Sequence, residues 1–376
     1  MRVLLVVGYT DSLFSSGIAQ QVYFTRMTLR AAGIDSEVAA VTPPIEAYAE
    51  VGVHTWQLFA DTDINGFDAA IFVSTNLIAT APGSEPFFQR MKARGVKVVS
   101  MLCGNYFYLL QEQFVFQKHT QHNLAGSLNN PYIDEYWALE TYQSYRPFIE
   151  ALTDKPVRVL PYCWSRDVMD RFCDKRKLDP CHSSGRSEGL RIVIAEPNVS
   201  VHKTALVPLL IANRMIGELD KQGIGAKVMV LGGKDVDHTV VSKFLPIYEQ
   251  GRVEVYPRMN LFHVLSELKD KSHPVIFISH QIDNGLNFLH FEATTLGYPI
   301  VHNSDQLQGT GGYYRDNDID TGVEKALAFA LESATAASRR QKRDAEVLQS
   351  FAPEHDRLIK GYLDTLGSLV SRPTTA

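Results

Sequence analysis

The chain has 376 residues, a length that suits two domains of roughly 150–200 residues each. Its 45% hydrophobic and 21% charged residues are typical of a folded globular protein, and its net charge of −5 gives it no general attraction for nucleic acid or anionic membranes. No apolar run approaches the ~20 residues of a membrane span, and the first residues lack the features of a signal peptide, so we expect a cytoplasmic protein.

The first half of the chain alternates between short apolar runs and amphipathic stretches. The apolar runs predict strands at 3–7, 36–41, 69–75, 96–102 and 156–162. The amphipathic stretches predict helices at 18–33, 86–95, 106–120 and 135–152. Near-continuous apolar strands between helices indicate a parallel sheet covered on both faces. We therefore predict an N-terminal Rossmann-like domain over residues 1–172.

Residues 173–189 are polar and charged, with Pro, Ser and Gly and no apolar period, which predicts a linker. The alternation then restarts. Strands are predicted at 190–196, 226–232, 252–257, 274–279 and 298–303, and helices at 204–223, 321–348 and 353–370. The basic run at 339–343 is interpreted as a solvated helix face.

The fold class that follows is α/β, with two doubly wound Rossmann-like domains facing each other across a cleft. The second domain is predicted over 190–350. Residues 351–376 are predicted to form a C-terminal helix, with the N-terminal domain as one candidate surface for it.

Polar side chains follow two neighbouring predicted strands of the second domain. His280, Asp283 and Asn284 follow the strand at 274–279. Asn303 and Ser304 follow the next strand. Ligands of open α/β sheets bind beyond the carboxyl ends of the strands, so these residues are candidates for a ligand site. A histidine there is, taken alone, more often a hydrogen-bonded structural residue.

Glu292 lies in the predicted helix between those two strands. Gly297 ends this helix and Pro299 follows it, which keeps the path between the strands short. An acid in this position commonly accepts hydrogen bonds from sugar hydroxyls, as the ribose-binding acid of dinucleotide folds does. The segment therefore favours an enzyme that uses a nucleotide sugar.

Two loops before helices are candidates for phosphate contacts. Ser200, Lys203 and Thr204 stand between a predicted strand and a long helix, where a lysine and free helix N–H groups favour an anion. A capping Ser or Thr beside an exposed lysine is the structural alternative. Gly17 ends the loop after the first strand, without the spacing of a dinucleotide fingerprint.

At Glu292 the sequence also carries a family resemblance. FEATTLGYPIVHN (291–303) resembles the Glu-Ala-x-x-x-Gly-x-Pro-Val-Val segment of retaining GT-B glycosyltransferases. The resemblance implies that Glu292 binds the ribose of the nucleotide, that Lys203 binds the diphosphate and that Gly17 contacts the donor. Residues 196–212 and 279–304 resemble more closely a little-characterised bacterial family of GT-B-like proteins, which strengthens the fold more than the activity.

The chain departs from the retaining family at three positions. The acid eight positions before Glu292 is replaced by Asn284. The arginine five positions before the lysine is replaced by Asn198, and a His-Gly pair of the first domain by Cys103-Gly104. The donor sugar, the phosphate clamp and the stereochemistry therefore stay open.

These observations favour a glycosyltransferase that moves a sugar from a nucleoside-diphosphate sugar to an unidentified acceptor: a glycan, a lipid-linked glycan or a modified nucleobase. His280, Asp283 and Asn284 would meet the sugar. No metal is expected, because a lysine and helix dipoles can stabilise the leaving diphosphate. The alternatives are a nucleotide-sugar epimerase and a non-catalytic binding protein; nucleic acid would enter only as an acceptor.

Overall fold

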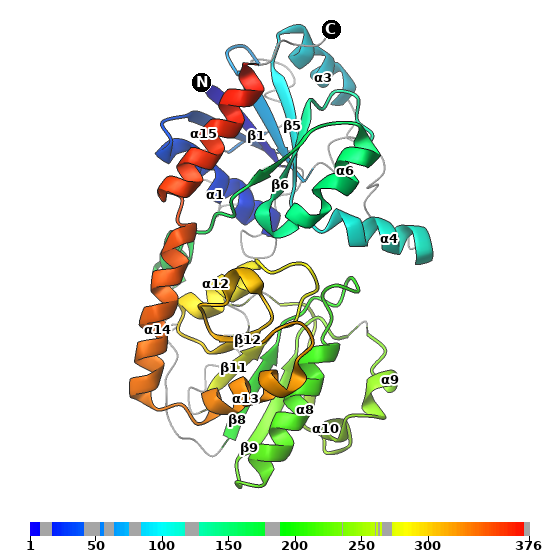
Figure 1. Ribbon diagram of the computed structural model, residues 1–376, viewed down its shortest axis with the longest axis vertical. Helices are drawn as coiled ribbons and strands as arrows, with labels where there is room; N and C mark the ends of the chain where they lie inside the picture. The colour runs from blue at the N-terminus through cyan, green and yellow to red at the C-terminus, as the bar shows by residue number, and fades with distance from the viewer. Residues whose placement is uncertain are drawn as a thin grey trace. The chain divides into compact units, whose positions relative to one another are not determined.

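The computed structural model describes residues 1–7, 17–40, 53–55, 64–74, 84–116, 128–176, 189–234, 236–259, 261, 264 and 273–371. The chain forms two compact units (Figure 1). Unit 1 consists of Met1–Ser165 together with Ser350–Ala376, and unit 2 consists of Arg166–Gln349. No helix within the described ranges is both long and apolar enough to cross a bilayer.

Unit 1 is built on a parallel seven-stranded sheet with the order β3-β2-β1-β4-β5-β6-β7. Its strands are β1 (Arg2–Val7), β2 (Asp35–Ala40), β3 (Val53–Thr55), β4 (Ala69–Val73), β5 (Lys97–Leu102), β6 (Glu135–Leu139) and β7 (Val157–Leu160). The central strands are buried along nearly their whole length, as expected of a parallel sheet covered on both faces.

Helices cover both faces of this sheet (Figure 1). The unit contains α1 (Gly17–Ala31), α3 (Ser84–Ala93), α4 (Tyr106–Phe116), the 3-10 helix η3 (Glu140–Tyr145), α6 (Arg146–Thr153) and α15 (Asp356–Val370). α1 and α15 share one apolar cluster, in which Tyr362 of α15 meets Trp137 of β6 edge-on at 6.5 Å. α3 and α6 contribute to the cluster on the opposite face. The segment after residue 350 thus completes the layer that α1 begins.

The predicted helix at 135–152 is wrong over its first residues, which form strand β6 between β5 and β7. Glu135 suggests an exposed helix start, yet it is fully buried, accepts a hydrogen bond from Trp137 Nε1 at 2.7 Å and lies 3.6 Å from Arg158 Nε. The hydrogen bond and the nearby guanidinium offset the free-energy cost of burying a carboxylate inside the sheet. The helical part of the stretch begins only after this strand, with η3 and α6.

Unit 2 contains a parallel six-stranded sheet with the order β10-β9-β8-β11-β12-β13. Its strands are β8 (Gly189–Ile194), β9 (Gly225–Val230), β10 (Val253–Val255), β11 (Val275–Ile278), β12 (Ile300–His302) and β13 (Gly312–Tyr313). Side chains of β11 alternate between the two faces. Ile276 and Ile278 join the cluster beneath α8 and α13, whereas Phe277 contacts the ring of Tyr298.

The helical segments of unit 2 follow the same alternation. They are α7 (Asp167–Arg176), α8 (Leu206–Asp220), α9 (Thr239–Ser242), α10 (Pro246–Glu249), α12 (Phe288–Thr295), the 3-10 helix η4 (Asp305–Leu307), α13 (Ile319–Ala330) and α14 (Ala334–Leu348), with η5 (Gln349–Phe351) at the passage to unit 1. α7 includes the first residues of the predicted linker at 173–189, and the rest of that segment up to β8 lies outside the described residues.

The single helix predicted at 321–348 is two helices, α13 and α14. Ser333 caps α14, because its hydroxyl accepts a hydrogen bond from Ala336 N at 3.3 Å. This cap lets the chain change direction, so that α13 packs on α8 while α14 packs on α12.

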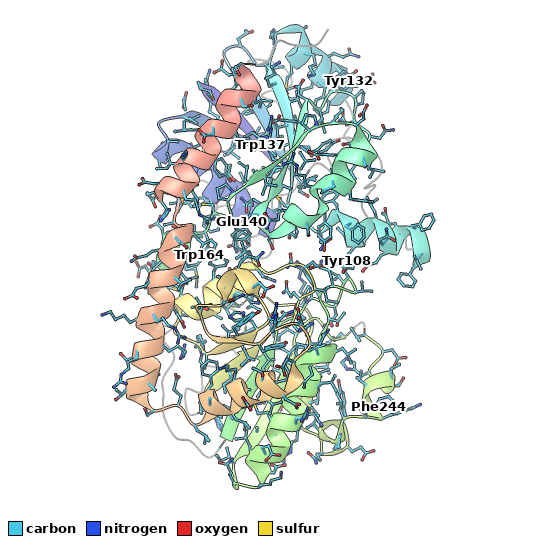
Figure 2. All side chains as sticks on the ribbon, in the orientation of Figure 1. Tyr108, Tyr132, Trp137, Glu140, Trp164 and Phe244 are labelled. Carbon is cyan, nitrogen blue, oxygen red and sulfur yellow. The ribbon has the colours of Figure 1, made fainter. Side chains whose placement is uncertain are left out.

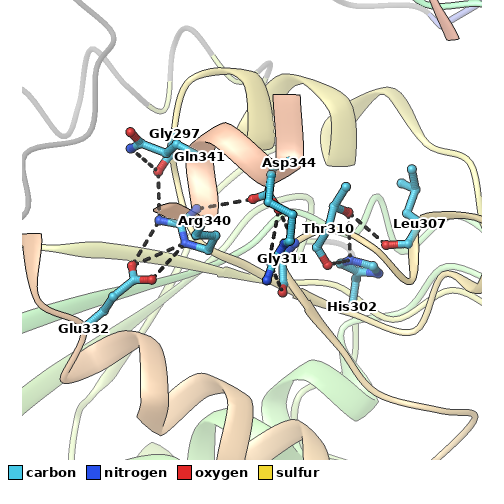
Figure 3. A network of polar contacts seen from close by, with 10 residues as sticks. Gly297, His302, Leu307, Thr310, Gly311, Glu332, Arg340, Gln341 and Asp344 are labelled. Carbon is cyan, nitrogen blue, oxygen red and sulfur yellow. Dashed lines mark hydrogen bonds and ion pairs between the residues drawn. The ribbon is translucent and has the colours of Figure 1, made fainter. Parts of the chain in front are cut away.

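The interpretation of the basic run 339–343 as a solvated face is wrong for Arg340, which is only 5% exposed. Its guanidinium lies 3.1 Å from Glu332 and 3.6 Å from Asp344, and it donates to Gly297 O at 3.2 Å (Figure 3). Asp344 also accepts from Gly311 N at 3.2 Å. Arg340 and Asp344 are one helical turn apart and share the inner face of α14, which explains why composition alone misassigned Arg340.

Candidate functional site

All strands of the unit 2 sheet are parallel, so the loops after them meet at one edge. Two loops dominate this carboxyl edge: residues 195–205 after β8 and residues 279–287 after β11. The backbone joins them directly, because Ile282 N donates to His202 O at 3.0 Å. The edge is therefore one structure made of two chain segments.

Glu196 is the centre of the edge, and it is fully buried. One carboxylate oxygen accepts hydrogen bonds from Ser279 Oγ and from His280 N, the latter at 3.3 Å. The other accepts from Gln281 Nε2 at 3.0 Å. Burial raises the pKa of Glu196 to about 7, although the bond from Ser279 and the charge of Lys203 oppose that rise.

The buried histidines behind Glu196 are structural. His290 Nε2 lies 2.9 Å from Ser279 Oγ, and because the hydroxyl proton goes to Glu196, His290 must donate through Nε2. His302 accepts from Ser304 N at Nδ1 (3.1 Å) and donates through Nε2 to Thr310 O (3.2 Å). Burial lowers the pKa of His302 to about 4, so this ring is neutral at pH 7.

His280, a predicted catalytic residue, follows β11 and is paired with Tyr314. Its Nδ1 lies 2.8 Å from the Tyr314 hydroxyl, and the two rings stack at 5.9 Å. The same hydroxyl is 3.4 Å from Ser279 O, so the shorter contact favours donation from Tyr314 to His280 Nδ1. Burial lowers the pKa of His280 to about 4. The imidazole is thus a neutral group whose Nε2–H is left for a ligand.

The other residues predicted after β11 and β12 hold the loop together. Asn303 exchanges two hydrogen bonds of 3.0 Å with the backbone of Gln281. Asn284 is buried and donates to the side chain of Gln281. Asp283 is exposed, with a positive φ of 46°. The loop that would meet a sugar is therefore fixed at two points and carries its acid at the exposed turn.

Ser304 and Gly285 lie close together on the carboxyl edge. The Ser304 hydroxyl is buried, and nothing in the described part of the chain hydrogen-bonds to it. A Cβ added at Gly285 would lie 3.2 Å from that hydroxyl and would collide with Gln306. Glycine at this position thus leaves room for the side chain of Gln306, which packs beside the buried hydroxyl.

The loop after β8 places Ser200, Lys203 and Thr204 before α8. Asn198, at a positive φ of 53°, accepts from Ala205 N at 2.7 Å at the entrance to α8, and no side chain caps that helix, so neither Ser200 nor Thr204 takes the capping role. Ser200 Oγ instead lies 2.6 Å from His202 Nδ1.

Lys203 is the cation of this loop. It is partly buried, and across the described ranges its amine has no hydrogen-bond or ion-pair partner. Burial lowers the pKa of Lys203, whereas the charge of Glu196 raises it. A partly buried ammonium without a direct partner is costly, and an anionic ligand would offset that cost.

Glu292 lies in α12 and is 7% exposed. The helix begins at the cap of Asn287, whose side chain accepts from Leu289 N at 3.0 Å. Nine of the ten predicted site residues thus belong to unit 2, on its carboxyl-edge loops or on the helix that joins two of its strands. Gly17 opens α1 in unit 1.

The sequence reasoning missed Glu196, Ser279 and Tyr314 as members of the edge. Glu196 is the first charged residue after β8, whose last three residues are apolar, and the rule that selected His280 would also have selected it. Tyr314 follows β13, a strand of two residues, and such a short strand leaves no usable period in the sequence.

No cluster of three or more metal-binding side chains occurs among the residues whose positions the structure gives. The expectation of a metal-independent site stays a prediction.

Comparisons with known proteins place this geometry in context. The model of a family described as "Protein of unknown function (DUF2827)" matches residues 3–366. No curated protein sequence matches the chain. One similar solved structure is an alpha-glucosyltransferase in complex with UDP and a 13-mer DNA containing a HMU base, with a TM-score of 0.60 and 10% identity over 99% of this chain and 100% of that chain. A second is the pneumococcal O-GlcNAc transferase GtfA in complex with UDP and GlcNAc, with a TM-score of 0.55 and 9% identity over 98% of this chain and 99% of that chain. A third is the alpha,alpha-trehalose 6-phosphate synthase from Burkholderia multivorans, with a TM-score of 0.56 and 9% identity over 98% of this chain and 97% of that chain.

These likenesses extend over both units and confirm the predicted α/β fold with two Rossmann-like domains, the GT-B fold. At identities of 9–10% they establish the fold alone.

Proposed function

The chain belongs to the DUF2827 family, and we propose that it is a glycosyltransferase that takes a sugar from a nucleoside-diphosphate sugar. The observation that carries the proposal is the carboxyl edge of unit 2, where two joined loops carry Lys203, whose ammonium has no partner among the described residues, and His280, whose Nε2–H is left for a ligand. Sites of this kind in open α/β sheets bind nucleotides.

Lys203 is proposed to bind the diphosphate. Its ammonium lacks a direct partner among the described residues, and its loop leads into the N-terminus of α8. A lysine acts on phosphate as a point charge, and a helix N-terminus adds partial positive charge along the same direction. Ser200 and Thr204 are proposed to line the same loop.

Glu292 is proposed to hold the ribose. A carboxylate is an acceptor for two neighbouring hydroxyls, which is the pattern that a ribose presents. Its helix is short and capped, so the carboxylate is held on a fixed frame between β11 and β12.

The loop after β11 is proposed to receive the donor sugar. His280 would donate a hydrogen bond from Nε2, and Asp283 and Asn284 would approach the sugar from the turn. Asn303 and Ser304 would complete this side of the site. Catalysis would consist mainly of positioning and of stabilising the negative charge that develops on the leaving diphosphate, without a metal.

The acceptor is proposed to be a glycan, a lipid-linked glycan or a nucleobase. The similar structures differ in their activities and complexes, since one is an alpha-glucosyltransferase in complex with DNA, another is an O-GlcNAc transferase and a third is a trehalose 6-phosphate synthase. Specificity for the acceptor is therefore not part of the shared fold.

The proposal is tested by titration calorimetry with UDP, GDP, TDP, ADP and CMP. We expect one nucleotide to bind, and Glu292→Ala to weaken that binding by about 10-fold or more, because the loss of hydrogen bonds to a charged group costs ~1.5–3 kcal/mol. Glu324→Ala, which removes an exposed glutamate of α13 in the same unit, is the matched control and should bind normally.

The binding nucleotide then selects the donor for turnover assays. Transfer to an added acceptor would support the proposal. Conversion of the donor without an acceptor would favour an epimerase, and binding without turnover a non-catalytic protein. If none of the five nucleotides binds, the proposal is wrong.

A further inference from the structure

The far end of α4 exposes three consecutive large apolar side chains. The exposed fractions are 86% for Phe114, 61% for Val115 and 57% for Phe116. The helix begins in an apolar cluster of unit 1, in which Tyr106 is buried. From there it extends away from the sheet of unit 1 (Figure 1). These three exposed residues are called the α4 tip below.

The exposure of the α4 tip runs around the helix and is not confined to one face. Consecutive residues of an α-helix point about 100° apart, so three in a row cover about 200° of its circumference. A helix that docks into a protein groove presents a single stripe of apolar residues, spaced three or four apart. The α4 tip is therefore better suited to an apolar medium that surrounds it than to a groove on one side.

The helix that carries the tip presents no charged side chain to solvent. Within Tyr106–Phe116 the one charged residue is Glu112, which is only 6% exposed. Gln111, exposed one turn before the tip, is a neutral amide. Charged groups are costly to move toward the apolar part of a bilayer, and this helix end avoids that cost. Its lack of charge thus matches a lipid surface.

The area of the α4 tip is small for a contact between two proteins. A phenylalanine side chain can bury about 150–250 Å², so the three exposed side chains together offer roughly 300–400 Å². A stable protein–protein interface takes about 800 Å² from each partner. The tip offers about half of that, whereas a few apolar side chains are enough to enter the boundary of a bilayer.

Phe244 of unit 2 shows how the tip differs from an ordinary exposed aromatic residue. It is 75% exposed, which is close to the value for Phe114. Its chain neighbour Lys243 is exposed as well, and so is Asp237 at the start of the same segment. A bilayer would have to accept these charges together with the ring. Phe244 is therefore a matched control for the tip.

We propose that the α4 tip inserts into the interfacial layer of a lipid bilayer and gives the chain a reversible contact with a membrane surface. The driving force is the burial of apolar side chains, which is compatible with the net charge of −5. The contact is weak, because even one myristoyl chain binds with only about 10⁴ M⁻¹. The inference goes beyond the proposed sugar transfer and needs no nucleotide.

The test is sedimentation of the full chain with phosphatidylcholine vesicles at up to about 5 mM lipid, a range set by the weak binding of a single apolar anchor. We expect the bound fraction to rise with lipid and to persist in about 0.5 M salt, because charge does not drive the contact. The double substitution Phe114→Ser and Val115→Ser should lower the partition coefficient about 10-fold or more. Phe244→Ser should bind as the wild-type protein does.

Phe114→Trp gives a second readout, which reports the position of the tip itself. Tryptophan favours the boundary between lipid and water, so this variant should still bind. Its emission should shift to shorter wavelength on vesicles, and brominated lipid should quench it. The wild-type protein supplies the background, since Trp137 and Trp164 are 0% and 3% exposed.

Three outcomes would overturn the inference, and none of them touches the proposed function, because nucleotide is absent throughout. The first is that the wild-type protein does not sediment with the vesicles. The second is that the tip variant and Phe244→Ser bind equally well, whether both keep or both lose the contact. The third is that sedimentation velocity shows a dimer that the tip variant abolishes, with no vesicle binding, which would make the tip a contact between two copies of the chain.

Discussion

At the scale of individual residues, three buried histidines of the carboxyl edge are each held in one neutral tautomer. The contacts of His280 and His302 each select one neutral tautomer, and the hydroxyl of Ser279 does the same for His290. A neutral imidazole with one nitrogen already bonded presents a defined donor at the other nitrogen. For His280, the hydroxyl of Tyr314 bonds to Nδ1 and thereby leaves Nε2 as the donor.

We expect Tyr314→Phe to release His280 from its single tautomer. Binding of the nucleotide sugar should weaken about 3–10-fold, since one hydrogen bond contributes ~1 kcal/mol, while binding of the bare nucleotide changes less. Nitrogen-15 NMR of the imidazole would show the second tautomer. Tyr313→Phe is the matched control, because that hydroxyl bonds to Asp305 instead. A single unchanged tautomer in Tyr314→Phe would contradict the assignment.

The residues of the site were predictable from sequence where strand and polar loop adjoin. His280, Asn303 and Ser304 each directly follow a buried run, and the structure places them on the carboxyl edge. Glu196 was not predicted, because its position depends on burial and on three donors from another segment, and neither is visible in the local sequence.

At the scale of elements, the sequence predicted the strands of both sheets better than the helices. Strand β6 was missed because a glutamate is unexpected in a buried strand, and the hydrogen bond from Trp137 to Glu135 that stabilises it forms only once the sheet has folded. α13 and α14 were merged because both are amphipathic and the cap at Ser333 resembles a helix-interior serine in sequence. Arg340 was misassigned for a related reason, since its partners come from three segments.

The network around Arg340 yields a prediction for α14. Arg340→Met should destabilise unit 2 by about 3–5 kcal/mol, because Glu332 and the buried Asp344 would lose their shared cation. Arg339→Met, at an exposed position one residue earlier, should change stability by less than ~0.5 kcal/mol.

Tryptophan provides the readout for this comparison. None of the three tryptophans of the chain, at 56, 137 and 164, falls in the residue range of unit 2, and Figure 2 labels Trp137 and Trp164. Loss of helical circular dichroism without a change of tryptophan fluorescence therefore reports unfolding of unit 2 alone. A loss that fluorescence follows in parallel would mean that the Arg340 network is not confined to unit 2.

At the scale of the whole molecule, the two units differ in their sensitivity to acid. Burial lowers the pKa of His202 to about 3 and those of His280 and His302 to about 4, all in unit 2. His290 shifts in the same direction. In unit 1, His355 is the histidine whose side chain the structure describes, and it is exposed.

We expect unit 2 to lose stability first as the pH falls from about 6.5 to 4. In that window the unfolded chain binds protons at these histidines and the folded chain does not, so the free energy of unfolding decreases with falling pH. Glu196, whose pKa is raised, contributes the opposite slope between about 4.5 and 7. Denaturant titrations at pH 7.5, 6 and 5 should show the circular-dichroism transition moving ahead of the fluorescence transition; coincident transitions at every pH would contradict the expectation.

The chain returns to unit 1 at Ser350, and this path has a consequence for biosynthesis. During translation, residues 166–349 leave the ribosome before Tyr362, Leu366 and Leu369, which fill the apolar layer around Trp137. One face of the unit 1 sheet therefore stays partly uncovered while unit 2 is synthesised, although the strands of unit 1 emerge first. The nascent chain exposes an apolar surface for longer than its order of domains suggests, and chaperones have that interval in which to act.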